Sequence, residues 1–200
     1  MAEIAGNDFM VSLGTDDFAT DPFQGNHQVG NREQQAGAFM HELGHNLGLR
    51  HGGGVDINCK PNYLSVMNYA FTFPAPVSNR PLDYSRSALA TLDEVELYEP
   101  DGVSASTPSG LTTAYGQTGV SPTIRTAPTG QPIDWNRDDF DGDDGVEESI
   151  NNFSPNIPEC YDISALTSLT GYDDWSNIKL PFTHLERMPT VQAFSLLIMK

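Results

Sequence analysis

Three closely spaced histidines, His41, His45 and His51, are the residues with the clearest capacity for chemistry. His41 and His45 are four residues apart, so on a helix their rings lie one turn apart on one face, where two imidazoles can bind one ion at ~2.0–2.1 Å. His51 follows Gly48, and glycine adopts the left-handed conformation that lets a chain turn back at a helix end. The spacing therefore predicts a zinc site with three histidine ligands and a fourth position for water.

Glu42, directly after the first histidine, stands where a general base is needed. It is offset around the helix, so its carboxylate can reach a water on the metal without itself binding the metal. The alternative is a helix with ordinary histidines, but the further glycine and histidine make an accidental match rarer by roughly several hundredfold. His27 and His184 lack ligand spacing, and we expect them to be solvated or structural.

The residues around the histidines predict the elements that position them. Apolar residues recur with helical spacing from Arg32 to Leu49, and the pattern stops at Gly48, which indicates a helix. Upstream, turn-forming residues flank the short apolar run from Phe9 to Leu13, which predicts an edge strand. Downstream, the segment from Tyr63 to Phe73 is compact and apolar, with a turn at its centre.

The remainder of the chain is less regular. Ser87 to Tyr98 has helical periodicity and predicts a second helix, with its acidic residues on the solvent side. Residues 101–132 are rich in Ser, Thr, Gly and Pro, so they form either a long loop or a run of short irregular strands, and we expect them at the surface. Trp175 to Phe182 and Val191 to Met199 supply apolar residues that we expect to pack back on the domain.

The run HELGHNLGLRH, residues 41–51, resembles the metzincin signature HExxHxxGxxH at every fixed position. Metzincins are zinc metallopeptidases with a methionine-containing turn beneath the metal, and the run SVMNY, residues 65–69, looks like this Met-turn. The resemblance implies a structural role for Met67, the methionine of that turn. In astacins and serralysins the tyrosine two residues later contacts zinc and stabilises the tetrahedral intermediate, so the resemblance implies a catalytic role for Tyr69.

The resemblance covers about Asp8 to Phe73 and leaves the metzincin subfamily unassigned. Gly52 stands where the better-known families have Pro, Glu, Asp or Ser, and Cys59 before the Met-turn is faintly similar to pappalysins. Only 40 residues precede His41, which leaves room for an edge strand but not for the strands and backing helix that metzincins have there. We therefore expect a truncated upper lobe.

The predicted fold class is α+β, a metzincin-like catalytic domain with an active-site helix, an edge strand and an irregular C-terminal lobe. We interpret residues 1–200 as one such domain. Residues 1–50 supply the edge strand and the active-site helix. Residues 51–200 form the lower lobe, which contains the Met-turn and an acidic loop.

The acidic loop suggests a second metal. Asp139, Asp141 and Asp143 alternate like the first three ligands of a calcium loop. The glycine and the glutamate that an EF-hand needs further along are absent, so the segment is not an EF-hand. A one-sided calcium loop that also uses Glu147 or Glu148 is one interpretation, and a solvated acidic loop is the alternative.

Composition and cysteine content limit the partners and the compartment. A net charge of −17, from 27 acids and 10 bases, argues against binding to nucleic acid or to an anionic membrane, and no apolar run is long enough to span a bilayer. Cys59 and Cys160 form either a disulfide or two buried thiols. The first residues lack the features of a secretion signal, and we infer a secreted or extracellular location from the resemblance and the cysteines.

The sequence thus predicts a zinc-dependent endopeptidase whose Glu42-activated water hydrolyses protein or peptide substrates, with calcium as a candidate second cofactor. One alternative is a binding or inhibitory module that keeps the zinc helix without a competent cleft, and Glu42 argues against it because a structural zinc site needs no base. The other is a zinc hydrolase for non-peptide substrates, and the Met-turn argues against it.

Overall fold

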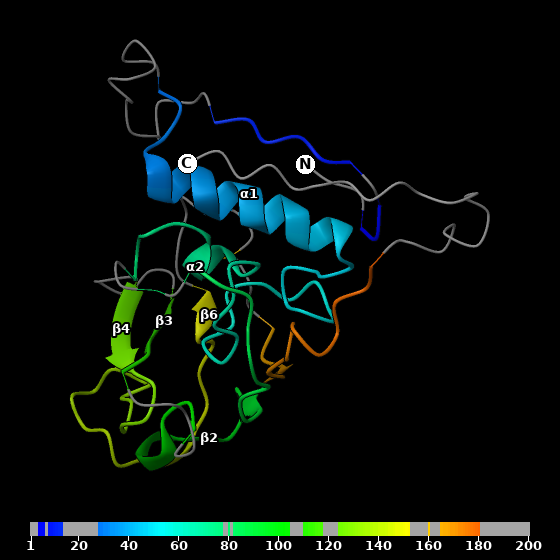
Figure 1. Cartoon of the computed structure of the whole chain (residues 1–200). Helices are drawn as coiled ribbons and strands as arrows, with labels where there is room; N and C mark the ends of the chain where they lie inside the picture. The colour runs from blue at the N-terminus through cyan, green and yellow to red at the C-terminus, as the bar shows by residue number, and fades with distance from the viewer. Residues whose placement is uncertain are drawn as a thin grey trace, which may run out of the picture.

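A single long helix, α1 (Arg32–Asn46), crosses the computed structural model above a group of short strands (Figure 1). The structure describes residues 4–6, 8–13, 28–77, 80, 82–104, 110–117, 124–152, 160 and 165–180. Within them the fold is mixed α+β, and no helix is long and apolar enough to cross a membrane. After α1 the chain forms α2 (Tyr69–Thr72), β1 (Leu92–Asp93), β2 (Leu97–Tyr98), the 3-10 helix η2 (Glu99–Asp101), β3 (Thr112–Gln117), β4 (Ile124–Pro128), β5 (Asp144–Val146), β6 (Asn151–Asn152) and β7 (Ser168–Leu169).

The strands make three small sheets. β3 is central in the largest, where it pairs antiparallel with β4 and parallel with β6. β1 pairs with β7 and β2 with β5, both antiparallel. Because each pairing joins segments that are short, side-chain packing between the sheets has to supply much of the stability.

The buried apolar residues form three clusters. One fills the space between the small sheets, where the Tyr115 and Trp135 rings meet edge to face at 5.1 Å. The second surrounds the two cysteines. The third lies against α1 and consists of Leu49, Tyr63, Val66, Met67 and Tyr84. Ile178 packs against this third cluster, as predicted for the segment that begins at Trp175, whereas residues 181, 182 and 191–199 lie outside the described part.

Cys59 and Cys160 form a disulfide, with their Cα atoms 5.6 Å apart. This confirms the bridged alternative over two free thiols. The bridge joins residues 101 positions apart, so the lost entropy of the unfolded chain stabilises the fold by about 4 kcal/mol in the loop-closure model.

The predicted edge strand from Phe9 to Leu13 is wrong. Apart from an isolated bridge at Phe9, residues 8–13 have no regular structure, and they follow α1 instead of a strand (Figure 1). Asn46 Nδ2 donates to the Asp8 carbonyl at 2.9 Å, and the Phe9 ring meets Phe39 edge to face at 5.3 Å. A strand needs a neighbouring backbone to pair with, and these two contacts are with a helix whose backbone is already satisfied.

The predicted helix from Ser87 to Tyr98 is also wrong, because the segment forms β1, a turn and β2. Two of its residues are reversed relative to the prediction, because Glu94 is fully buried and Val95 is 52% exposed, whereas Leu92 and Leu97 are buried as expected. The Glu94 carboxylate accepts hydrogen bonds from Ile150 N at 2.8 Å and Thr167 N at 3.0 Å. These distant donors outweigh the local periodicity, and burial raises the pKa of Glu94.

Residues 101–132 are not simply surface. Their described part contains the β3–β4 hairpin, and Val103, Ala114 and Tyr115 are buried. The sequence has few aliphatic residues here and so gave little sign of a buried hairpin. The buried hydrophobic residues of the hairpin are the small Ala114 and the aromatic Tyr115.

Candidate metal centre

α1 begins at a well-formed cap. The Asn31 side chain accepts from Gln34 N, and the Gln34 side chain accepts from Asn31 N, both at 2.9 Å. This reciprocal pair satisfies two amides that have no partner within the helix. The helix extends to Asn46, which confirms the helix predicted from the apolar spacing, and Gly48 at φ +86° makes the turn after it.

The turn at Gly48 brings the third histidine to the first two. The ring centroid of His51 lies 5.2 Å from that of His41 and 4.9 Å from that of His45. Ligand atoms of the three residues all lie within 4.8 Å of one another, close enough to hold one ion. The structure therefore brings together the three predicted ligands.

Backbone carbonyls orient two of the rings. Nδ1 of His41 donates to Val66 O at 3.0 Å, and Nδ1 of His45 donates to Leu49 O at 2.9 Å. A carbonyl oxygen only accepts, so in these bonds Nδ1 carries the proton and Nε2 keeps its lone pair. Carbonyl groups hold metal-binding histidines in this way in many proteins. The donor set therefore fits a metal.

Burial keeps His41 in the form that binds metals. Its side chain is buried, and burial with the two neighbouring histidines lowers the pKa of His41 to about 3, although the bond to Val66 acts the other way. The ring is thus neutral at physiological pH, and no proton has to leave before Nε2 can bind a cation.

Met67 lies directly beneath the helix. It is fully buried, and a Cβ added at Gly44 would lie 2.1 Å from its Sδ atom and 3.0 Å from the Tyr84 ring. Only glycine at position 44 lets the methionine approach so closely. Met67 and α1 are therefore in van der Waals contact, and the structural role that the resemblance implies for Met67 stays a prediction.

Side chains from distant parts of the chain hold the Met-turn. Asp174, which is fully buried, accepts from Tyr63 Oη at 2.7 Å, from Ser65 Oγ at 2.5 Å and from Ser85 N at 2.9 Å. Ser65 Oγ in turn accepts from Met67 N at 3.1 Å. Asp174 was not predicted from the sequence, and no local signal marks it, because its partners lie 89 to 111 positions away.

The two predicted catalytic residues belong to the same region. The Tyr69 ring stacks on His41 with centroids 5.0 Å apart and lies 4.6 Å from the His51 ring. Glu42 is half-buried on α1, and its Oε2 atom is shielded from solvent. Among the described residues, Glu42 is not part of the group of converging ligand atoms, which leaves its carboxylate for another role.

Gly52, the residue that departs from the better-known families, has a steric explanation. A Cβ there would lie 2.3 Å from Ile57 O and 2.9 Å from Val55 O. Any larger residue after the third histidine would push these carbonyls aside. The close return of the chain at Val55 to Ile57 therefore requires glycine at position 52.

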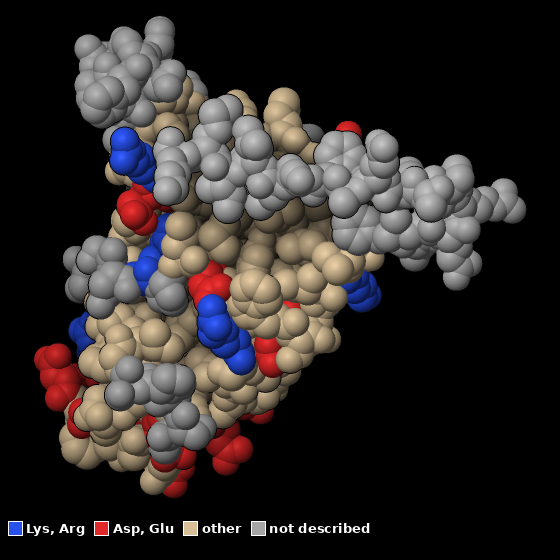
Figure 2. Space-filling model, in the orientation of Figure 1, with Lys and Arg blue, Asp and Glu red and all other residues tan. Residues whose placement is uncertain are grey.

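The acidic loop does not form a second cluster. Asp139, Asp141 and Asp143 are described, yet the structure does not group them as candidate ligands of one ion. Asp139 and Asp141 are exposed, and the Asp143 carboxylate accepts from Asn136 Nδ2 at 3.1 Å. Acidic residues gather at the end of the molecule away from α1 (Figure 2). Calcium binding stays a prediction, and the alternative of a solvated acidic loop matches this exposure better.

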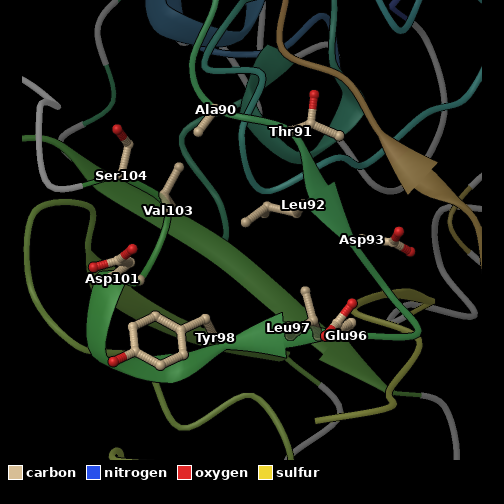
Figure 3. A pocket seen from close by; sticks show the side chains of 11 residues that line it. Ala90, Thr91, Leu92, Asp93, Glu96, Leu97, Tyr98, Asp101, Val103 and Ser104 are labelled. Carbon is tan, nitrogen blue, oxygen red and sulfur yellow. The ribbon is translucent and has the colours of Figure 1, made fainter. Parts of the chain in front are cut away.

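Other candidate positions lie away from the histidines. His27 and His184 are outside the described residues. A pocket of about 380 Å³ opens between β1, β2 and residues 101–104, where Leu92 and Val103 face each other and the Asp93 carboxylate points away (Figure 3). It shares no residue with the candidate metal centre.

Substitution of Gly44 by alanine tests the contact between helix and Met-turn. Alanine in a helix normally adds about 0.5–1 kcal/mol of stability, but the clash with Met67 should reverse the sign and cost about 1–3 kcal/mol. The free energy of unfolding from urea titration measures this. In a Met67→Ala background the same substitution should cost much less, and a stabilising effect of Gly44→Ala alone would contradict the packing.

No protein-family model, curated protein or solved structure matches this chain. What the candidate metal centre does must therefore be inferred from its own residues and geometry.

Proposed function

We propose that this chain is a zinc-dependent endopeptidase of the metzincin kind. The observation that carries the proposal is the convergence of His41, His45 and His51, whose ligand atoms lie within 4.8 Å of one another. The signature HExxHxxGxxH and the methionine packed beneath the helix support it. The disulfide between Cys59 and Cys160 supports a secreted or extracellular location, since such bridges persist in oxidising compartments.

The donor set favours zinc in a catalytic role. Imidazole nitrogens suit zinc, and structural zinc sites almost always use four protein ligands, whereas catalytic sites use three. Among the described residues, no fourth His, Cys, Asp or Glu belongs to the group. When bound, zinc supplies Lewis acidity, which acidifies water and polarises a carbonyl group.

Glu42 and Tyr69 complete the proposed chemistry. Glu42 accepts a proton from the attacking water and passes it to the leaving amine, the role of a general base and then a general acid. The Tyr69 hydroxyl donates a hydrogen bond to the carbonyl oxygen of the substrate as that oxygen gains negative charge. The ring contacts of Tyr69 with His41 and His51 support this assignment, because they keep the phenol beside the ligands.

The purified protein should contain about one zinc per chain, because three converging imidazoles supply the ligands of a catalytic site. Elemental analysis after dialysis measures it. The His51→Ala variant should retain far less zinc, and the His41→Ala, His45→Ala double variant should retain almost none. His27→Ala is the matched control and should keep the metal, whereas equal zinc content in all variants would refute the ligand assignment.

Glu42→Gln should keep zinc and the fold but lose peptidase activity by about 10²–10⁴-fold, the contribution typical of a general base. Glutamine preserves the shape of the side chain and cannot take the proton. Hydrolysis of casein, with and without a chelator, measures the loss. Glu96→Gln changes an exposed glutamate near β2 and should leave activity intact. Equal cleavage by the Glu42 variant and the wild type would exclude this mechanism.

Tyr69→Phe should lower kcat by 10- to 1000-fold with little change in KM, because its hydroxyl acts mainly on the transition state. Zinc content and Tm should not change, since the ring and its packing remain. The exposed Tyr98, on β2, provides the control variant Tyr98→Phe. Full kcat in the Tyr69 variant would reduce Tyr69 to a packing residue.

A further inference from the structure

We propose that Lys60 is a positioning residue for the third histidine: it holds the Gly52 carbonyl, and thereby fixes the loop that carries His51. The inference rests on the proposed function, because it takes His51 to be a metal ligand. Lys60 lies nine positions after His51 and matches no part of the metal-binding signature.

Lys60 is an unusual buried residue. Its side chain is fully buried, and Nζ donates to Gly52 O at 2.9 Å and to Thr170 O at 2.5 Å. Nζ also lies 5.2 Å from the centre of the Tyr63 ring. Burial of an ammonium group is costly unless hydrogen bonds and nearby charges offset the loss of water. A lysine at this position therefore indicates a task that an apolar side chain does not perform.

The His51 loop needs support from outside. Three glycines, residues 52–54, follow the histidine, and glycine loses more conformational freedom on folding than any other residue. Within the loop, Arg50 and Gly53 form an isolated backbone bridge, and Gly52 N donates to Val55 O at 2.9 Å. The loop has no side chains of its own at 52–54 with which to anchor itself.

Two residues from elsewhere supply that support. The Lys60 ammonium donates a hydrogen bond to the carbonyl of Gly52, the residue directly after His51. The Tyr172 ring covers the next two glycines so closely that a Cβ would lie 2.4 Å from it at Gly53 and 2.9 Å at Gly54. Tyr172 contributes shape, whereas Lys60 contributes a directional bond to the residue directly after the ligand.

Lys60 is itself firmly placed. Cys59, the preceding residue, is held by the disulfide to Cys160. The Lys60 carbonyl accepts from Asn68 Nδ2 at 2.9 Å, and Asn68 directly follows Met67. One residue thus joins the Met-turn, through its main chain, to the third-ligand loop, through its side chain. Movement of either part relative to the other would strain these bonds.

An apolar residue of the same size would not replace this link. Methionine fills a similar volume, but it donates no hydrogen bond, so the carbonyls of Gly52 and Thr170 would lose their Nζ donor in a buried place. The loop would then gain freedom where His51 has to be held. The expected result is weaker metal binding by the third ligand, with the His41 and His45 bonds to their carbonyls unchanged.

The test is a double-mutant cycle on zinc affinity, measured by competition with a chromophoric chelator. Lys60→Met should weaken zinc binding by about 10–100-fold, the range typical when a group that orients a ligand is removed. Arg32→Met, at an exposed arginine in the first turn of α1, should stay within about twofold of the wild type. In a His51→Ala background, Lys60→Met should have almost no further effect, because a positioning residue acts through the histidine it positions.

Cobalt substitution gives a second readout that a general loss of stability would not produce. The visible absorption spectrum of cobalt-loaded Lys60→Met should shift toward that of cobalt-loaded His51→Ala, while circular dichroism stays native. If Lys60→Met does not fold, Lys60→Gln takes its place in the same cycle, since its amide still donates but is shorter and uncharged.

Three results would overturn the inference. Wild-type affinity and cobalt spectrum in the folded Lys60 variant would show that the loop holds itself. An equal loss of affinity with and without His51 would show that Lys60 acts on the whole fold and not on the third ligand. Absence of zinc binding by the wild type would refute the proposed function and this inference with it. That result differs from the other two because it is seen in the wild type alone, without any Lys60 variant.

Discussion

Two backbone carbonyls, those of Val66 and Leu49, determine the orientation of two histidine rings in the candidate metal centre. Each accepts from Nδ1 of a histidine on α1, so Nε2 of both rings carries the lone pair. The Val66 carbonyl belongs to the Met-turn, and the Leu49 carbonyl follows the glycine turn that ends the helix. A displacement of either backbone segment would rotate the ring bonded to it, so the surrounding structure must hold both segments.

Buried acidic side chains hold segments together throughout this fold, whose described strands are two to six residues long. Asp174 ties the Met-turn to residue 85, and Glu94 joins two separate backbone amides to the turn between β1 and β2. Glu99 is fully buried and accepts from Trp135 N and Asp143 N, so it anchors the start and the end of the acidic segment. Such groups are costly to bury, but each makes several directed bonds that short strands do not provide.

Local patterns predicted the site well and the rest of the fold less well. The helix, its end at Gly48 and the approach of His51 follow from spacing within about twenty residues, and the structure has all three. The predicted second helix failed because apolar spacing does not reveal that Glu94 has donors near positions 150 and 167. The edge strand failed because the neighbour of Phe9 is a helix. Lys60 and Asp174 carry no local signal, since their partners Thr170 and Tyr63 lie over a hundred positions away.

The short segment from Thr170 to Asp174 contacts both the Met-turn and the loop that follows His51. Thr170 O accepts from Lys60, Tyr172 covers the glycines after His51, and Asp174 binds the Met-turn. If the proposed centre binds its ion, docking of this segment and binding of the ion are linked, and each favours the other by the same free energy. Loss of metal would thus loosen a piece of chain more than a hundred residues away in sequence. Cleavage of the chain near Thr170 would, conversely, weaken metal binding at the proposed centre, so the lifetime of the intact chain and its metal content would be coupled.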